Sequence, residues 1–239
     1  MIKQLKKRVF TFRRKKRFLS FYNKYINEGD LCFDIGANIG NRTEVFLNLK
    51  ARVVSVEPVK ETYDILEKRF GQHRNSTILQ LGLGGEVGQK NIHISEISEV
   101  CTFSEQFIEK YKTQQEFNIE WNTLQLVNIS TLDQLISDYG TPAFCKIDVE
   151  GSELEVLKGL SQPLPLISFE YNAKLKGLAL ECINKLSQFD SLFYNFSPYE
   201  SMIFSFESWQ NESEFVQFIS TLPDEIKTGD IYVKHQRKE

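Results

Sequence analysis

Residues 31–84 alternate short apolar runs with amphipathic segments, and this alternation restricts the fold more than any other feature of the chain. The runs "LCFDI" (31–35), "ARVVSVEP" (51–58) and "STILQLGLG" (76–84) predict three strands. Between them, residues 38–50 and 60–70 have the apolar spacing of helices. A strand-helix-strand-helix-strand order is typical of parallel sheets, so we predict an α/β fold with a doubly wound, mostly parallel sheet.

The later part of the chain repeats this alternation. The stretch "PAFCKIDVEGSELEVLKGL" (142–160) predicts a strand that ends at Asp148 and a helix that follows Gly151. Thr131 and Gln134 have the spacing of a capping box, which predicts a short helix just before that strand. The remaining predicted elements are a strand at 165–172, a helix at about 175–188 and closing strands within 192–206 and 230–235.

The pattern loosens over residues 85–130, where only two short strands are indicated. Long irregular insertions in compact folds are usually lids or binding loops, so we expect this excursion to lie near the substrate entrance. No repeat, low-complexity linker or domain boundary interrupts the rest of the chain. We therefore predict one domain over residues 23–239, preceded by an arm over residues 1–22.

The arm differs from the body in charge. Residues 1–17 hold nine Lys or Arg and no acid, which leaves 20 bases against 32 acids in the rest of the chain. Aromatic and aliphatic residues lie between these bases, and this mixture suits three arrangements of the arm. The arm could be a terminal helix that packs on the body, an amphipathic helix on an anionic membrane surface, or a segment that contacts nucleic acid. The acidic body disfavours nucleic acid.

Other features of the chain predict a cytoplasmic protein, peripheral on the inner membrane surface if the arm binds lipid. No apolar run reaches the length of a membrane-spanning helix, and bases at 13–17 interrupt the place where a signal peptide would be apolar. The four cysteines lie far apart without a CxxC pair, so we expect reduced thiols. The hydrophobic fraction of 41% is that of a globular protein.

The turn "FDIGANIGNRT" (33–43) predicts a nucleoside ligand. Its spacing is D-x-G-x-x-x-G, from Asp34 through Gly36 to Gly40, and differs from the G-x-G-x-x-G of dinucleotide sites. An acid beside the turn would repel a pyrophosphate but suits the cationic methionine half of S-adenosylmethionine. Glu57, which ends the second strand, can accept both ribose hydroxyls. Taken singly, each of these residues has a structural alternative as a turn glycine, a cap or a solvated strand end.

These residues, with "VVSVEP", "LGLGGEVG", "CTFSE", "TLDQL" and "KIDVEGSELEVLKGL", resemble the FkbM-type methyltransferases in the same order over about residues 30–172. The resemblance implies the fold of class I S-adenosylmethionine enzymes, a Rossmann-like seven-stranded sheet with one antiparallel strand. It implies O-methylation of a saccharide, glycolipid or secondary-metabolite hydroxyl. The cofactor turn would be Asp34, Gly36, Asn38 and Gly40, with Glu57 on the ribose. Leu81 and Gly82 would meet the adenine.

Methyl transfer to a hydroxyl needs a general base close to the acceptor oxygen. Asp148 and Glu170 end two strands predicted to be neighbours, so we expect Asp148, and after it Glu170, to be catalytic. Asp148 has the alternative role of a helix cap, and Glu150 and Glu153 that of complementing a helix dipole. A divalent metal on Asp148, Glu150 and Asn172 would suit oxygen ligands, but the spacing alone does not predict one.

Two other functions fit parts of the sequence. An RNA methyltransferase would use the basic arm, and a non-catalytic binding module would keep the cofactor fold for partner recognition. We expect a small-molecule or lipid-linked saccharide as the acceptor. The sequence indicates neither the methylated position nor the oligomeric state.

Overall fold

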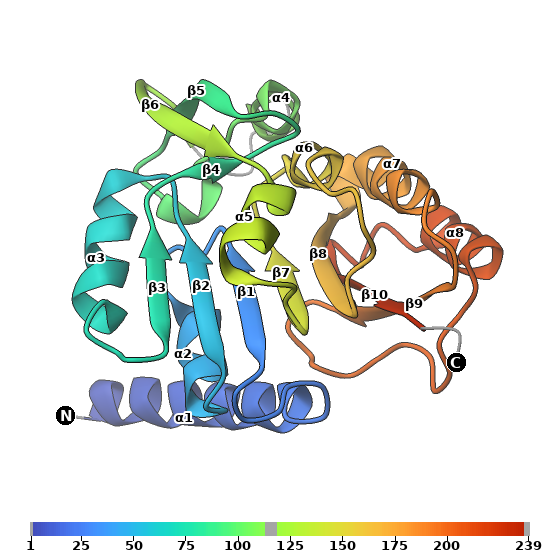
Figure 1. Ribbon diagram of the computed structural model, residues 1–239, viewed down its shortest axis with the longest axis horizontal. Coiled ribbons are helices and arrows are strands. Elements are labelled where there is room, and N and C mark those ends of the chain that lie inside the picture. The colour runs from blue at the N-terminus through green and yellow to red at the C-terminus, as the bar shows by residue number, and fades with distance from the viewer. Residues whose placement is uncertain (1, 113–118, 237–239) are drawn as a thin grey trace.

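The computed structural model describes residues 2–112 and 119–236, and for residues 2–11 it describes the backbone alone. Its centre is a seven-stranded sheet in the order β3-β2-β1-β7-β8-β10-β9 (Figure 1). Neighbouring strands are parallel except at β10, which runs antiparallel to both β8 and β9. The structure thus confirms the predicted fold class, including the single antiparallel strand. The strands are β1 Leu31–Ile35, β2 Arg52–Val56, β3 Ser76–Leu79, β7 Phe144–Ile147, β8 Leu166–Asn172, β9 Leu192–Pro198 and β10 Thr228–His235.

Helices cover both faces of this sheet, because strands in a parallel sheet bury both of their faces. Helices α5 to α8 pack on one face and α1 and α2 on the other, while α3 lies beside β3 (Figure 1). The helices are α1 Ile2–Tyr22, α2 Asn41–Asn48, α3 Lys60–Phe70, α4 Glu105–Lys112, α5 Leu132–Tyr139, α6 Glu153–Lys158, α7 Lys176–Leu186 and α8 Glu212–Thr221, with 3-10 turns η1 Ser98–Val100 and η2 Ala173–Leu175.

The last turns of α1 belong to the hydrophobic core. Phe18, Phe21 and Tyr22 are all buried, and Phe21 packs its ring edge-to-face on those of Phe204 and Tyr232. Aromatic pairs of this kind add to the free energy of burying the rings. The basic arm therefore packs on the body through its aromatic side chains, one of the three arrangements that its sequence suits. No helix among the described residues is both long and apolar enough to cross a membrane.

The excursion is more regular than predicted. A second sheet, in the order β4-β6-β5, consists of β4 Gly82–Leu83, β5 Gly88–Ile94 and β6 Thr123–Ser130. This sheet and α4 lie beyond the carboxyl ends of β2 and β3 (Figure 1). The predicted strand over 76–84 was therefore wrong in its extent, because its second half leaves the main sheet and pairs with β6. Helix α4 was missed, since its burial rests on only two apolar side chains, Phe107 and Ile108.

Two other helix predictions can be compared with the structure, and one further helix was missed. Helix α2 begins at Asn41, later than the predicted residue 38, because Asn38 and Gly40 adopt left-handed turn conformations. Thr131 caps α5 as predicted, by accepting a hydrogen bond from the Gln134 backbone at 3.1 Å. Helix α8 was not predicted. Its sequence "NESEFVQFI" begins with a typical N-cap residue, Asn211, which does cap the helix in the structure.

Candidate active site

A cleft lies where β1, β2 and β7 end, and it brings together most of the residues predicted to bind a cofactor. Asp34, Gly36, Asn38, Glu57, Leu81 and Gly82 all line it, together with Asp148. Gly40 does not line it. Instead Gly40 precedes α2 with a φ of 85°, and a Cβ there would lie only 2.5 Å from Leu66 and 2.6 Å from Phe70. Its place in the motif thus reflects helix packing beside the cleft.

The turn after β1 is hydrogen-bonded to the end of β2 and packs closely against the segment after β7. Backbone N–H groups of Gly36 and Ala37 donate to the Val56 carbonyl at the end of β2, at 2.9 and 3.0 Å. On the other side, a Cβ on Gly36 would lie 1.8 Å from the Asp148 carbonyl oxygen. Gly36 also has a φ of +77°, which residues with a Cβ rarely adopt. Only glycine allows this close approach of the turn to the segment after β7.

Glu57 presents a fixed carboxylate to the cleft. The side chain is buried, and one oxygen accepts the Asn38 N–H at 2.8 Å while the other accepts the Val59 N–H at 2.9 Å and the Thr62 hydroxyl at 2.8 Å. Burial raises the pKa of Glu57, and these three hydrogen bonds counteract the rise. A carboxylate held this way keeps its orientation at the strand end and has acceptor capacity left for ligand hydroxyls.

Asp34 is also buried at the base of the cleft, where Thr43 of α2 donates to it at 2.6 Å. The Thr43 hydroxyl in turn lies 2.8 Å from that of Ser55 on β2. Burial raises the pKa of Asp34, and the Thr43 hydrogen bond opposes that effect. The alternative role considered for Asp34 was a cap for Asn38. In the structure the hydrogen-bond donor to the Asp34 side chain is instead the Thr43 hydroxyl.

Residues of the excursion complete the apolar side of the cleft. Ile92 from β5 and Phe103 from the loop before α4 line it together with Val59, Leu81 and Leu83. Ser98, from η1, lies 3.5 Å from the Asn38 amide. The excursion was expected near the substrate entrance, but Ile92, Ser98 and Phe103 were not among the predicted site residues. The 100–122 stretch has no clear period from which contacts could be predicted.

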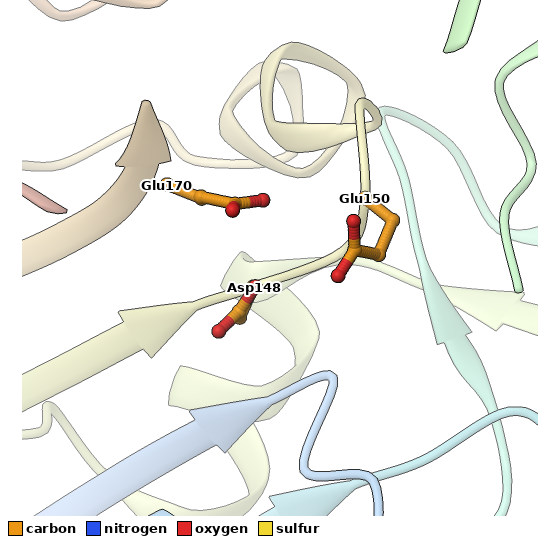
Figure 2. Close-up of side chains that lie close together, drawn as sticks. All are labelled: Asp148, Glu150 and Glu170. Carbon is orange, nitrogen blue, oxygen red and sulfur yellow. The ribbon is translucent and has the colours of Figure 1, made fainter. Parts of the chain in front are cut away.

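A second cavity adjoins the first. It is lined by polar and charged residues from β8, β10 and the loop after β9, and the two cavities share Arg42, Asp148 and Glu200. Figure 2 shows that Asp148, Glu150 and Glu170 lie near one another, with carboxylate oxygens within 4.8 Å. The two predicted catalytic residues, Asp148 and Glu170, are therefore neighbours as expected from their strands.

Lys146 is a part of this site that sequence reasoning left without a role. Its ammonium, on β7, is only 1% exposed and lies 3.1 Å from Asp148 and 3.0 Å from Asp230 on β10. Burial alone would lower the pKa of Lys146, but the two carboxylates raise it above its ordinary value. Lys146 thus stays charged and fixes the Asp148 carboxylate where the two cavities meet.

The other acids of the group differ from Asp148 in their surroundings. The pKa of Glu170 is raised well above its usual range, by burial first and then by the charges of Glu150 and Asp148. The pKa of Glu150 is raised for similar reasons, with Asp148 and Glu153 as its charged neighbours. Acids whose surroundings separate their pKa values can take different roles in proton transfer. The cluster therefore contains an acid fixed by an ammonium beside two acids whose charged forms are disfavoured by burial and by neighbouring carboxylates.

The loop after β7 is capped by Glu153. Its carboxylate accepts the N–H groups of Val149 at 3.2 Å and Gly151 at 3.3 Å, so the cap role considered for Asp148 falls to Glu153. Asn172, considered as a metal ligand, bonds Tyr111 through its amide nitrogen and the Lys174 N–H through its oxygen. The third member of the acidic group is Glu170 and not Asn172. Three carboxylates can suit a divalent cation, but such groups are common without one, and we assign none here.

Comparison with known proteins gives one family. The sequence pattern of the methyltransferase FkbM domain matches residues 34–185. Hexuronic acid methyltransferase AglP of Haloferax volcanii is 30% identical over 145 residues, covering 59% of this chain and 54% of that protein. The match therefore spans about half the length of that relative.

Two solved structures are similar over most of the chain. An O-methyltransferase from Bacillus cereus, solved with SAH, is 12% identical and has a TM-score of 0.45, with 94% of this chain and 81% of that chain covered. A putative rRNA-methylase from Clostridium thermocellum is 10% identical and has a TM-score of 0.46, with 92% and 94% covered. At these identities and scores, neither structure discriminates between acceptors.

The buried Glu153 carboxyl predicts a pH-dependent stability. Burial raises its pKa to about 7 from an ordinary 4.5, so the folded chain binds this proton more tightly than the unfolded chain. The resulting stability is present below pH 4.5 and is lost as pH rises through 7. Glu153→Gln should therefore stabilise the chain at pH 8 by about 1 kcal/mol or more relative to pH 5, measured by urea unfolding.

Glu155→Gln is the matched control, because Glu155 lies on the same helix and is 42% exposed. Its effect on the free energy of unfolding should be the same at both pH values. An equal effect of Glu153→Gln at pH 5 and pH 8 would show that its carboxyl titrates normally.

Proposed function

We propose that this chain, which belongs to the FkbM methyltransferase family and is an S-adenosylmethionine-dependent methyltransferase, methylates a hydroxyl oxygen of a saccharide. The observation that carries the proposal is the position of Asp148. Its side chain lines both the cleft with the predicted cofactor residues and the adjoining polar cavity. A group at that junction can contact an acceptor hydroxyl while the methyl donor lies in the cleft.

The residues of the first cleft fit a nucleoside with an amino-acid tail. The buried Glu57 carboxylate suits the two ribose hydroxyls, and Leu81, Gly82 and Phe103 offer an apolar slot for adenine. At Gly82 a Cβ would lie 2.8 Å from Ile129 and 2.9 Å from Phe103, so the slot depends on the absence of a side chain at residue 82. Asp34, Gly36 and Asn38 would face the methionine half, as the family resemblance implies.

When bound, S-adenosylmethionine supplies a methyl group on a sulfonium, which an oxygen nucleophile can attack directly. The protein contributes position and a place for the proton. Asp148, held by Lys146, would accept a hydrogen bond from the acceptor hydroxyl and orient it. Glu170, whose carboxylate lies beside that of Asp148, is the second candidate for the base that takes the proton as it leaves.

The acceptor class follows from the second cavity and from the relative. The cavity lining is rich in groups that bond hydroxyls, including Tyr199, Thr228 and Asp230. AglP is described as a hexuronic acid methyltransferase, which supports a sugar acceptor for this chain as well. RNA as the acceptor is supported by the basic arm alone.

The proposal predicts transfer of labelled methyl from S-adenosylmethionine to carbohydrate extracted from the native host. Asp148→Asn should lower the turnover number by about a hundredfold or more, because it removes a group that orients and deprotonates the hydroxyl. Asp64→Asn, on the exposed side of α3 and 55% exposed, is the matched control and should keep full activity.

Label that enters RNA and no carbohydrate fraction would contradict the saccharide proposal and favour the RNA alternative. Cofactor binding without transfer to any fraction would favour a non-catalytic module. Thermal melting of each variant separates lost chemistry from lost folding.

The outward side of α1 supports peripheral contact with an anionic membrane surface, which we propose as a second property of the chain. Phe12 is 70% exposed, and its neighbours Arg13, Lys16 and Arg17 are exposed as well. An exposed aromatic ring between bases suits the interface of a bilayer, where each base near an anionic surface contributes about 1 kcal/mol. The inner membrane surface is the proposed location.

This contact predicts sedimentation with phosphatidylglycerol vesicles at low salt and release at high salt, because exposed charges are screened. Phe12→Ser should weaken sedimentation while leaving the melting temperature unchanged, since Phe12 lies outside the core. Equal binding to neutral phosphatidylcholine vesicles, or no binding to either, would contradict the proposal.

A further inference from the structure

We propose that Arg14 of α1 and Arg42 of α2 form a subsite for a carboxylate group of a bound ligand. This inference rests on the proposed function, because it assigns a ligand group to the same pair of cavities. Both side chains line the first cleft, and Arg42 also lines the second. Neither residue stands out in the sequence, since Arg14 lies in a run of bases and Arg42 lies within a predicted helix.

The two guanidinium groups converge on a single carboxylate oxygen. Arg14 donates to Glu200 Oε1, and Arg42 Nη2 lies 3.4 Å from the same atom. The Nε atoms of both arginines are buried, and neither has a hydrogen-bond partner among the described residues. Buried donors without partners are uncommon in folded proteins, so each Nε indicates an acceptor that arrives with a ligand.

Arg42 is held in place independently of any ligand. Its side chain is 12% exposed, and its guanidinium lies 4.0 Å from the centre of the Phe18 ring, a cation–π contact. Burial alone would lower the pKa of Arg42, but nearby tyrosines and the acids Asp230 and Glu200 raise it. The subsite therefore offers a charged, oriented donor before ligand binds.

The two arginines share one carboxylate as their ion-pair partner, that of Glu200. Glu200 faces both arginines, and the next acid, Asp230, bonds Lys146 at 3.0 Å. Glu200 itself is 41% exposed in the loop after β9, so it can give up one arginine at little cost. Guanidinium groups bind carboxylates in a bidentate geometry that matches both partners. A ligand carboxylate would satisfy the Nε donors that have no partner among the described residues.

Two ligand carboxylates can reach this position. One is the amino-acid carboxylate of the methyl donor, which lies in the first cleft in the proposed arrangement. The other is a carboxylate on an acidic acceptor sugar in the second cavity, which Arg42 also lines. In either case α1 contributes a residue to the site, which gives the amino-terminal helix a role in ligand binding.

Calorimetric titration distinguishes the two sources. S-adenosylhomocysteine carries the amino-acid carboxylate, and methylthioadenosine has the same nucleoside without it. If the cofactor is the source, Arg14→Gln should weaken binding of S-adenosylhomocysteine about tenfold or more and leave methylthioadenosine unchanged. If an acceptor is the source, the variant should bind both nucleosides normally. It should then weaken binding of methyl glucuronide, but not of methyl glucoside, to the S-adenosylhomocysteine complex.

Arg13→Gln is the matched control, because it removes the same charge from an exposed position on the same helix. Arg42→Lys is the second variant, which keeps the charge and loses the bidentate fork. The subsite is overturned if Arg14→Gln and Arg42→Lys bind every one of these ligands as the wild type does, or weaken all of them equally. Failure of the wild type to bind S-adenosylhomocysteine at all would instead overturn the proposed function.

Discussion

The contact between Gly36 and the backbone of Asp148 is the constraint on which the rest of the site depends. Strands β1 and β7 are neighbours in the sheet, with Ile35 opposite Ile147, and the Asp148 N–H donates to the Ile35 carbonyl at 2.9 Å. The turn after β1 then passes so close to Asp148 that residue 36 has no room for a side chain. Because of this contact, the residues that fit a cofactor and the residue best placed for catalysis line one cleft.

The electrostatics of the site depend on buried charges that neutralise one another. Lys146 lies between Asp148 and Asp230, so the cost of burying its ammonium is offset by two carboxylates, that of Asp230 buried with it and that of Asp148 38% exposed. For Glu170, burial and the neighbouring acids raise the pKa, and the charge of Lys146 opposes this rise without cancelling it. Lys146 therefore fixes Asp148 in an ion pair, whereas burial and neighbouring acids disfavour the charged form of Glu170, and this difference in surroundings suits the two acids to different roles in proton transfer.

Most of the sheet and of the cleft could be predicted, because each depends on local order along the chain, while the single antiparallel strand was implied by the family resemblance alone. Asp34, Gly36 and Glu57 end or follow parallel strands, and parallel strands that are neighbours bring such ends together. Arg42, Lys146 and Arg14 could not be found this way. Their roles depend on which long side chains meet across α1, β7 and β10, and a single sequence does not show those pairings. Residues of the excursion line the cleft, but α4 and Phe103 follow no period that would have identified them.

The most direct test is whether the cleft binds a nucleoside through Glu57, the acid that follows β2. The wild type and Glu57→Gln would each be titrated with S-adenosylhomocysteine and with NAD. The wild type should bind S-adenosylhomocysteine and not NAD, and the variant should bind it at least tenfold more weakly at a temperature where its melting curve shows that it is still folded. Equal affinity in the well-folded variant, or no binding by the wild type, would contradict the assignment of this cleft.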